Sequence, residues 1–229
     1  RAALDAAGYD AYRRRVIDFW EQVLARALQI DLPEEKVVHA QRANLIYDLI
    51  ARDIDADGKH FTQKVNEFQY DHFYPRDTAY IARSYDLYGL HDIARQSIAP
   101  FLSYDDDGAP VNVRRLMPDD WGQSLWALGS HARITHDHAF AERIYGPIRP
   151  HVEALVDGLR TEPLGLWAAA GRYDNEVVDG HYTGHNFWVL LGLREARGLA
   201  ERVGADVEHV LEPIDSHRAL MARISSTLL

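Results

Sequence analysis

The chain has 229 residues, 47% hydrophobic and 26% charged, which is typical of a globular domain. Its formal net charge of −10 argues against nucleic acid or an anionic membrane as a partner, because both attract a basic face. The lack of cysteine excludes disulfides and thiolate metal sites, and no apolar run approaches the roughly 20 residues of a membrane span. The chain starts at Arg1 and shows no signal peptide, so we expect residues to precede it and leave the localisation unknown.

Helical periodicity dominates the first part of the chain. From Ala11 to Ile30, large apolar residues recur at three- and four-residue steps and predict an amphipathic helix. Pro33 and the two glutamates after it indicate a new helix start, because proline and acidic residues both suit a first turn. We expect this second helix to run to about Ile54.

Three helical hairpins are predicted after these helices. Each consists of a first helix, a short turn and a return helix. We expect the second return helix to bend at its prolines. Gly89 is a natural C-terminal cap in the first turn. We expect no regular strand, with brief pairing open for 111–113 and 166–169. The predicted helices cover residues 78–87 and 93–102, 121–134 and 139–156, and 187–202 with 207 onward.

The hairpins repeat loosely, since Asp77 and Asp120 open equivalent helices 43 positions apart. The predicted fold class is therefore all-α, with about four antiparallel helix hairpins in a single domain over residues 1–229. Stacked hairpins place all loops that precede a first helix at one end and the short turns at the other.

The loops at the first of these ends have an unusual composition. Residues 66–77, 114–121 and 173–188 are rich in aromatic, acidic and amide side chains, whereas ordinary loops carry mostly Gly, Ser and Lys. Loops of this composition are typical of binding surfaces, and hairpin stacking predicts that all three face one pocket.

The first two loops combine carboxylates with aromatic rings. Tyr74, Arg76 and Asp77 can bind a polyhydroxylated ligand, because apolar sugar faces need aromatic rings and hydroxyl groups need paired donors and acceptors. The alternative for Asp77 is a helix cap. Asp120 and Trp121 repeat the design, with a capping aspartate and a core tryptophan as the alternative.

The third loop contains the candidate for an acid catalyst. Glu176 lies mid-loop among aromatic residues, where a carboxyl can stay protonated near neutral pH; its alternative is a solvated glutamate. His181 and His185 are four residues apart, but the glutamate of a zinc helix is missing between them, so hydrogen bonding is favoured over metal binding. Tyr182 is a further candidate for stacking on a sugar.

Residues 53–58 have the acidic spacing and glycine of a calcium loop. The twelfth position, which should be glutamate, is Lys64. A polar turn at the end of a helix is therefore favoured over calcium binding.

The chain resembles the six-hairpin glycosidases, the (α/α)6-barrel superfamily that includes glucoamylases. Residues 74–79, Tyr-Pro-Arg-Asp-Thr-Ala, look like the segment that holds the sugar where cleavage occurs. Residues 120–128 are similar to the family's Asp-x-x-Gly-x-x-Leu-x-Ala-Leu helix start. Residues 165–167 followed by 181–186 look like the region that carries the general acid. The likeness spans about residues 60–205, in the same order.

The chain departs from this family at two points. Ala168 stands where the family has the glutamate directly after tryptophan, so the acid role passes by inference to Glu176, with Asp174 or Asp179 as alternatives. A full barrel needs twelve helices and the sequence predicts about eight. The family's general base belongs to the last hairpins, so we expect it beyond Leu229.

The resemblance implies an inverting glycoside hydrolase that acts on an oligo- or polysaccharide. Glu176 would be the general acid, and the sugar would be bound by Tyr74, Arg76, Asp77, Asp120, Trp121, Tyr182 and His185. No metal or other cofactor is implied, and the oligomeric state is left open. Two other functions stay open: a sugar epimerase or polysaccharide lyase with His181 or His185 as base, and a non-catalytic carbohydrate-binding module.

Overall fold

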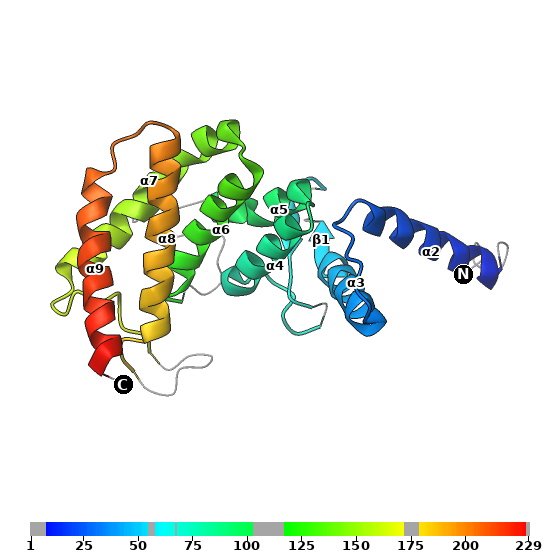
Figure 1. Cartoon of the computed structure of the whole chain (residues 1–229), viewed down its shortest axis with the longest axis horizontal. Helices are drawn as coiled ribbons and strands as arrows, with labels where there is room; N and C mark the ends of the chain where they lie inside the picture. The colour runs from blue at the N-terminus through cyan, green and yellow to red at the C-terminus, as the bar shows by residue number, and fades with distance from the viewer. Residues whose placement is uncertain (1–7, 55–57, 67, 103–116, 172–178, 228–229) are drawn as a thin grey trace.

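The computed structural model describes residues 8–54, 58–66, 68–102, 117–171 and 179–227 (Figure 1). These residues are mostly helical, which confirms the all-α prediction at that level. The elements are α2 (Tyr9–Ala25), α3 (Glu35–Ile50), β1 (Arg52–Ile54), β2 (Phe61–Gln63), α4 (Pro75–Leu87), α5 (His91–Ile98), the short 3-10 helix η1 (Ala99–Leu102), α6 (Asp120–Thr135), α7 (His138–Thr161), α8 (Thr183–Arg202) and α9 (Glu208–Thr227).

A short β-hairpin corrects the prediction that regular strands are absent. Helix α3 ends at Ile50, and Arg52–Ile54 pairs antiparallel with Phe61–Gln63 instead of continuing the helix. Asp53 and Ile54, the first residues of the predicted polar turn, belong to β1, and residues 55–57 lie outside the described residues. Lys64 forms an ion pair with Asp53, so the twelfth residue of the calcium-like pattern neutralises the first. Residues 111–113 lie outside the described residues.

The three predicted hairpins are confirmed, with shifted boundaries. Helix α4 begins three residues earlier than predicted, with Pro75 in its first turn, where its missing N–H is no loss. Gly89 has a φ of 76°, as the C-terminal cap requires. Helix α7 continues to Thr161 and contains Pro147 and Pro150 inside it.

Helices α4, α6 and α8 are parallel neighbours. Arg76 and Asp119 pair near the starts of α4 and α6, and Asp86 and His131 pair near their ends. In the same way, His185 approaches Asp119 at one end of α8, and Glu195 binds Arg133 of α6 toward the other. Contacts that advance together along both chains require parallel axes, so all three helices start at one end (Figure 1).

The return helices form a second layer against these three. Helix α5 contacts α4 and α6, α7 contacts α6 and α8, and α9 contacts α8 and α7. One apolar core fills the space between the layers and also takes in Phe73 and Trp167 from the loops. Its fully buried members include Phe101, Leu125, Leu128, Ile144, Ile148, Leu155, Leu193 and Leu199.

Helices α6 and α8 approach each other closely enough for backbone contact. A Cβ atom added to Gly122 would lie 2.2 Å from the carbonyl carbon and oxygen of Trp188. One added to Gly192 would lie 2.5 Å from the Gly122 oxygen. Real atoms do not approach so closely, so glycine at both positions permits this packing.

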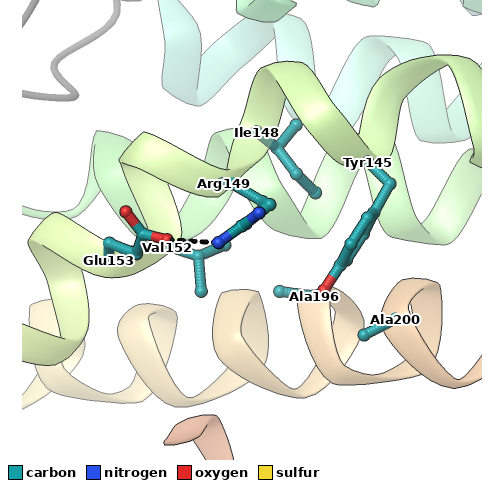
Figure 2. A pocket seen from close by; sticks show the side chains of 7 residues that line it. All are labelled: Tyr145, Ile148, Arg149, Val152, Glu153, Ala196 and Ala200. Atoms are coloured by element: carbon teal, nitrogen blue, oxygen red, sulfur yellow. Dashed lines mark hydrogen bonds and ion pairs between the residues drawn. The ribbon is translucent and has the colours of Figure 1, made fainter. Parts of the chain in front are cut away.

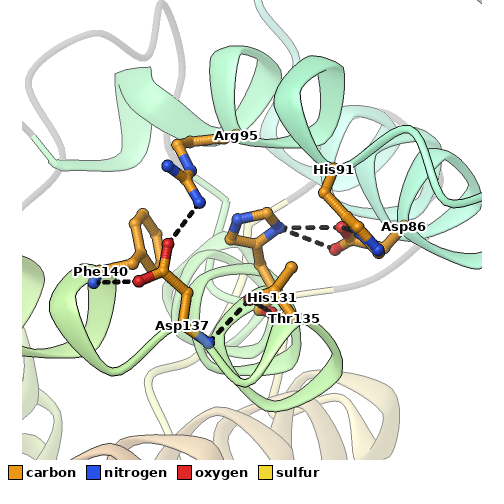
Figure 3. A network of polar contacts seen from close by, with 7 residues as sticks. All are labelled: Asp86, His91, Arg95, His131, Thr135, Asp137 and Phe140. Atoms are coloured by element: carbon orange, nitrogen blue, oxygen red, sulfur yellow. Dashed lines mark hydrogen bonds and ion pairs between the residues drawn. The ribbon is translucent and has the colours of Figure 1, made fainter.

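The short-turn end is held by a polar network (Figure 3). The carboxylate of Asp86 is buried, and it lies 2.9 Å from Nδ1 of both His91 and His131. Asp137 caps α7 by accepting from the Phe140 N–H at 2.8 Å, which lowers its pKa together with Arg95 at 2.5 Å. The network joins the α4–α5 hairpin to the α6–α7 hairpin.

The N-terminal helices pack on the body only in part. Leu24 and Leu45 join a small core with Tyr85 of α4. The predicted apolar stripe of α2 is otherwise largely exposed, with Val16 at 56% and Phe19 at 57%, and α2 extends away from the other helices (Figure 1). None of the described helices has both the length and the apolar character needed to cross a membrane.

The glycine contact predicts opposite effects for two substitutions in α8. We expect Gly192→Ala to lower the free energy of unfolding by about 1–3 kcal/mol, because its methyl group meets the α6 backbone. Gly198 has open space at its Cβ position, so Gly198→Ala should raise that free energy by about 0.5–1 kcal/mol. Urea unfolding measures both values; equal effects would contradict the close approach.

Candidate functional site

The N-terminal ends of α4, α6 and α8 bring polar side chains together around Asp119. Its carboxylate is 4% exposed and accepts from Arg76 Nε at 3.0 Å and Arg76 Nη2 at 3.3 Å. Gln123 donates to it at 3.0 Å, and His185 Nε2 lies 3.9 Å from its other oxygen. Asp119 thus contacts three side chains from three helices, and we call this group the Asp119 cluster.

The alternative interpretation of the aspartates as helix caps does not match the two helix starts, because no side-chain capping hydrogen bond is made at either N-cap. The N-cap of α4 is Tyr74, and Asp77 lies inside the first turn, where a carboxylate suits the helix dipole. Asp119 does occupy the N-cap position of α6, but its side chain makes no capping hydrogen bond. Its oxygens face the Asp119 cluster instead. Sequence reasoning therefore missed the central role of Asp119 and Gln123, although both belong to the motif at 119–123.

Asp120 is a second buried carboxyl beside the first. It is 3% exposed and accepts the Met117 N–H at 2.7 Å. Burial raises its pKa to about 7, and the neighbouring charges of Asp119 and Asp77 act in the same direction. The Met117 hydrogen bond and Arg76 oppose this shift without cancelling it. Asp120 therefore retains a proton into the neutral range, beside an Asp119 carboxylate that accepts from Arg76 and Gln123.

Two tyrosines lie close in sequence to the members of the Asp119 cluster, and one of them contacts His185. The Tyr182 ring lies 5.3 Å from the His185 ring, and the Tyr74 ring lies 5.2 Å from Tyr70, distances between centroids. Tyr74 and Tyr182 are both half-buried. The structure therefore brings six of the predicted sugar-binding residues to one end of the molecule: Tyr74, Arg76, Asp77, Asp120, Tyr182 and His185.

Trp121 is placed at the same end but packs toward α7. Its ring stacks on His151 at 4.8 Å with an interplanar angle of 13°, and its edge meets Trp167 at 5.4 Å. His151 also lies 2.7 Å from the Trp121 carbonyl oxygen. These contacts give Trp121 a packing role between α6 and α7, and its predicted role in stacking on a sugar stays a prediction.

A second aromatic group lies further along the same three helices. Tyr80, Trp126 and Trp188 come one from each of α4, α6 and α8, and their ring centroids are 5.3–5.8 Å apart. Tyr80 is 53% exposed. Each of the three residues lies five or six positions after the first residue of its helix, and this spacing is a usable sequence signal because it places the rings at the same level of parallel helices.

The Glu176 loop itself lies outside the described residues, but its base does not. Ala170 and Gly180 pair through two backbone hydrogen bonds, from Ala170 N at 2.8 Å and from Gly180 N at 3.0 Å. Asp174 also lies outside the described part, and Asp179 is exposed beside the pairing. The loop is therefore closed at its base at 170 and 180.

Trp167 connects this base to the Asp119 cluster. Its indole N–H donates to the Pro118 carbonyl at 2.6 Å, immediately before Asp119. Its backbone N–H donates to Asn186 Oδ1 at 2.8 Å, and His181 Nδ1 donates to its carbonyl at 2.7 Å. Trp167 is thus fixed to the start of α6 and to the start of α8.

The two histidines of the third loop have different partners. His181 contacts Trp167 and lies 3.6 Å from Glu162, whereas His185 faces Asp119. Among the described residues, no group of three or more histidine and carboxylate side chains is placed to hold a metal ion.

A small cavity lies between α7 and α8 (Figure 2). It is bordered by an ion pair between Arg149 and Glu153 at 3.1 Å, and its wall is otherwise mainly apolar. Ala196 and Ala200 place it near the C-terminal part of α8, away from the Asp119 cluster. Its lining residues are Tyr145, Ile148, Arg149, Val152, Glu153, Ala196 and Ala200.

Comparison with protein-family models and with curated proteins finds neither a matching family model nor a matching curated sequence.

The raised pKa of Asp120 predicts how stability depends on pH. Folded Asp120, with a pKa of about 7 against 3.8 in an unfolded chain, binds more protons than the unfolded state between these values. Stability should therefore fall as the pH rises from about 4 to about 7, by up to about 4 kcal/mol from this group. In Asp120→Asn, which can still accept from Met117, this loss should disappear.

Urea unfolding of both proteins between pH 4 and pH 8 measures the difference. Asp157→Asn on the exposed face of α7 is the control for loss of one charge. If Asp120→Asn and the wild type lose stability in parallel across this range, the carboxyl is not the cause.

Proposed function

We propose that the protein is a glycoside hydrolase, and that α4 to α9 form part of an (α/α)6 toroid. The observation that carries the proposal is the Asp119 cluster, in which side chains from the starts of three parallel helices meet at one end. In a toroid of hairpins, the first helices form the inner ring and their starts surround one pocket. The parallel layer of α4, α6 and α8 supports such an inner ring.

The chemistry of the cluster supports a neutral, polyhydroxylated ligand. Arg76 is held in a fixed plane by its two hydrogen bonds to Asp119, with 30% of its side chain exposed. Tyr74 directly precedes α4 and Tyr182 directly precedes α8, and both are half-buried. Fixed donors and acceptors between aromatic faces match alternating hydroxyl groups and apolar ring faces.

The proposed mechanism is inverting hydrolysis with Glu176 as the general acid. Glu176 donates its proton to the leaving glycosidic oxygen as the bond from that oxygen to the anomeric carbon breaks. A carboxylate beyond Leu229 takes a proton from water, which attacks the opposite face of the anomeric carbon. Arg76, Asp77 and Asp120 hold the sugar hydroxyls during this step.

A second candidate function is proton abstraction from a sugar by an epimerase or lyase. His185 Nε2 lies 3.9 Å from an Asp119 oxygen, and a histidine beside a carboxylate can serve as a general base. This reaction predicts solvent deuterium in a sugar that is not hydrolysed. Hydrolysis predicts no such incorporation into the carbon skeleton.

The acid role of Glu176 predicts a large loss of turnover in Glu176→Gln of the full-length protein. Removing a general acid costs about a hundredfold to ten-thousandfold in rate. Release of reducing sugar from α- and β-linked oligosaccharides measures turnover, and thermal unfolding checks that the variant folds. Asp174→Asn and Asp179→Asn are the comparison variants; full activity in Glu176→Gln would remove Glu176 from the mechanism.

The binding role of Arg76 predicts weaker affinity in Arg76→Lys. Lysine keeps the charge but cannot make both bonds to Asp119, so we expect an affinity loss of about tenfold. Arg95→Lys is the matched control, because Arg95 also binds an aspartate, Asp137, at the opposite end. Calorimetry with maltopentaose and cellopentaose measures affinity; equal losses in both variants would contradict a local role.

A further inference from the structure

His217 of α9 is buried next to the candidate site. It is 2% exposed, its Nδ1 lies 3.0 Å from the Gly165 carbonyl oxygen, and its Nε2 lies 3.3 Å from the Asn186 carbonyl oxygen. One ring therefore joins α9 to the segment before Trp167 and to the first turn of α8. Leu220, one turn later on α9, lies beside Gly165 as well.

A chain of hydrogen bonds leads from this ring to the Asp119 cluster. Asn186 is 1% exposed; its Oδ1 accepts from the Trp167 N–H at 2.8 Å, and its Nδ2 donates to the Tyr182 carbonyl at 2.9 Å. The Trp167 indole then donates to Pro118 at 2.6 Å, directly before Asp119. His217 is thus three residues removed from Asp119, through Asn186, Trp167 and Pro118.

We propose that His217 is a positioning residue, which holds Asn186 and Trp167 so that the turn at Pro118 keeps Asp119 and Asp120 in place. Helices α6 and α8 are already fixed to each other by their glycine contact. The segment from 162 to 171 reaches the start of α6 through Trp167, whose indole donates to Pro118 and whose ring packs on Trp121. His217 supplies the support for that segment from α9. The effect of His217 on sugar binding rests on the proposed function, whereas its effect on the turn at Pro118 does not.

Protonation of the imidazole gives His217 a pH dependence that an apolar residue at the same position would lack. A neutral imidazole has one N–H and can satisfy only one of the two carbonyls, whereas the protonated ring satisfies both. Burial nevertheless lowers its pKa, against the two backbone hydrogen bonds. The folded state therefore binds fewer protons than the unfolded state below the ordinary pKa of 6.5, and stability falls as the pH drops through that window.

The other titratable groups around this ring are few among the described residues. On α9, Asp215 and Arg218 are adjacent in sequence and exposed. In the Trp167 segment, Glu162 lies 3.6 Å from His181, which also contacts the Trp167 carbonyl. A pH series must therefore include a His181→Gln variant to separate the two histidines.

The test is the indole N–H of Trp167, followed by NMR and assigned with a Trp167→Phe variant. In the wild type we expect this signal to shift with an inflection below pH 6.5 and to exchange slowly with solvent. His217→Leu, which removes the ring N–H donor, should speed the exchange by about three- to tenfold, the equivalent of one neutral hydrogen bond. His217→Gln retains an uncharged donor, so it should restore slow exchange but remove the inflection.

Met221→Ala is the matched control. Met221 lies one turn along on α9 and is 2% exposed, and its substitution weakens the packing of α9 without removing a donor. The proposal is overturned if Met221→Ala, at equal thermal stability, changes the Trp167 signal as much as His217→Leu. It is also overturned if His217→Leu leaves that signal unchanged.

The same variants separate this inference from the proposed function. If the protein hydrolyses glycosides, His217→Leu should lower kcat/KM by about the same factor as it speeds the indole exchange, and His217→Gln should restore it. If the wild type neither binds nor hydrolyses any oligosaccharide, the proposed function fails. The indole signal still decides the positioning role in that case.

Discussion

The backbone contact between α6 and α8 is the constraint on which the candidate site depends. Two helices normally pack with their axes 8–10 Å apart, because side chains fill the space between them. Gly122 and Gly192 remove those side chains at the crossing, so the backbones touch. The contact fixes the position of α8 along the axis of α6. Asp119 and His185 are consequently level at one end, and Arg133 and Glu195 are level at the other.

The electrostatics of the site follow from this arrangement. Two neighbouring carboxyls are buried at the start of α6, where ionisation of both would place like charges in a poorly solvated space. Arg76 reaches Asp119 with two hydrogen bonds and stabilises its charge. Asp120 has the Met117 N–H, which is a weaker compensation, and its pKa rises to about 7. Asp119 is therefore a fixed hydrogen-bond acceptor, and Asp120 keeps its proton near neutral pH.

Much of the helical fold was predictable from the sequence, because apolar periodicity and turn residues are local signals. The three hairpins, the cap at Gly89 and the clustering of loops at one end all follow from such signals. The β-hairpin at 52–63 was not predictable in this way. Its strands are three residues long, and the first follows α3 after a single residue, so a helical pattern continues into it.

The candidate site was predictable in location but not in detail. Composition identified Arg76 and Asp120, since arginine and aspartate in aromatic loops are unusual. It could not identify Asp119 as the acceptor for Arg76, because that pairing depends on the position of α4 along the axis of α6. His217 gave no signal at all, since a single histidine on a helix has no pattern, and its role depends on two carbonyl groups 52 and 31 positions away.

Polar side-chain pairs hold the layer at both ends, and the rich-loop end is where we propose that a ligand binds. At the short-turn end, Asp86 joins His91 and His131, and Arg95 joins Asp137, so adjacent hairpins bind each other directly. At the rich-loop end, the hairpins are joined through Asp119 and through loop residues. Asp119 contacts side chains of α4, α6 and α8 there, the Trp167 indole donates to the Pro118 carbonyl, and 30% of the Arg76 side chain stays exposed. A ligand at this end meets groups already fixed in position, so less conformational entropy is lost on binding than if the ligand had to order them.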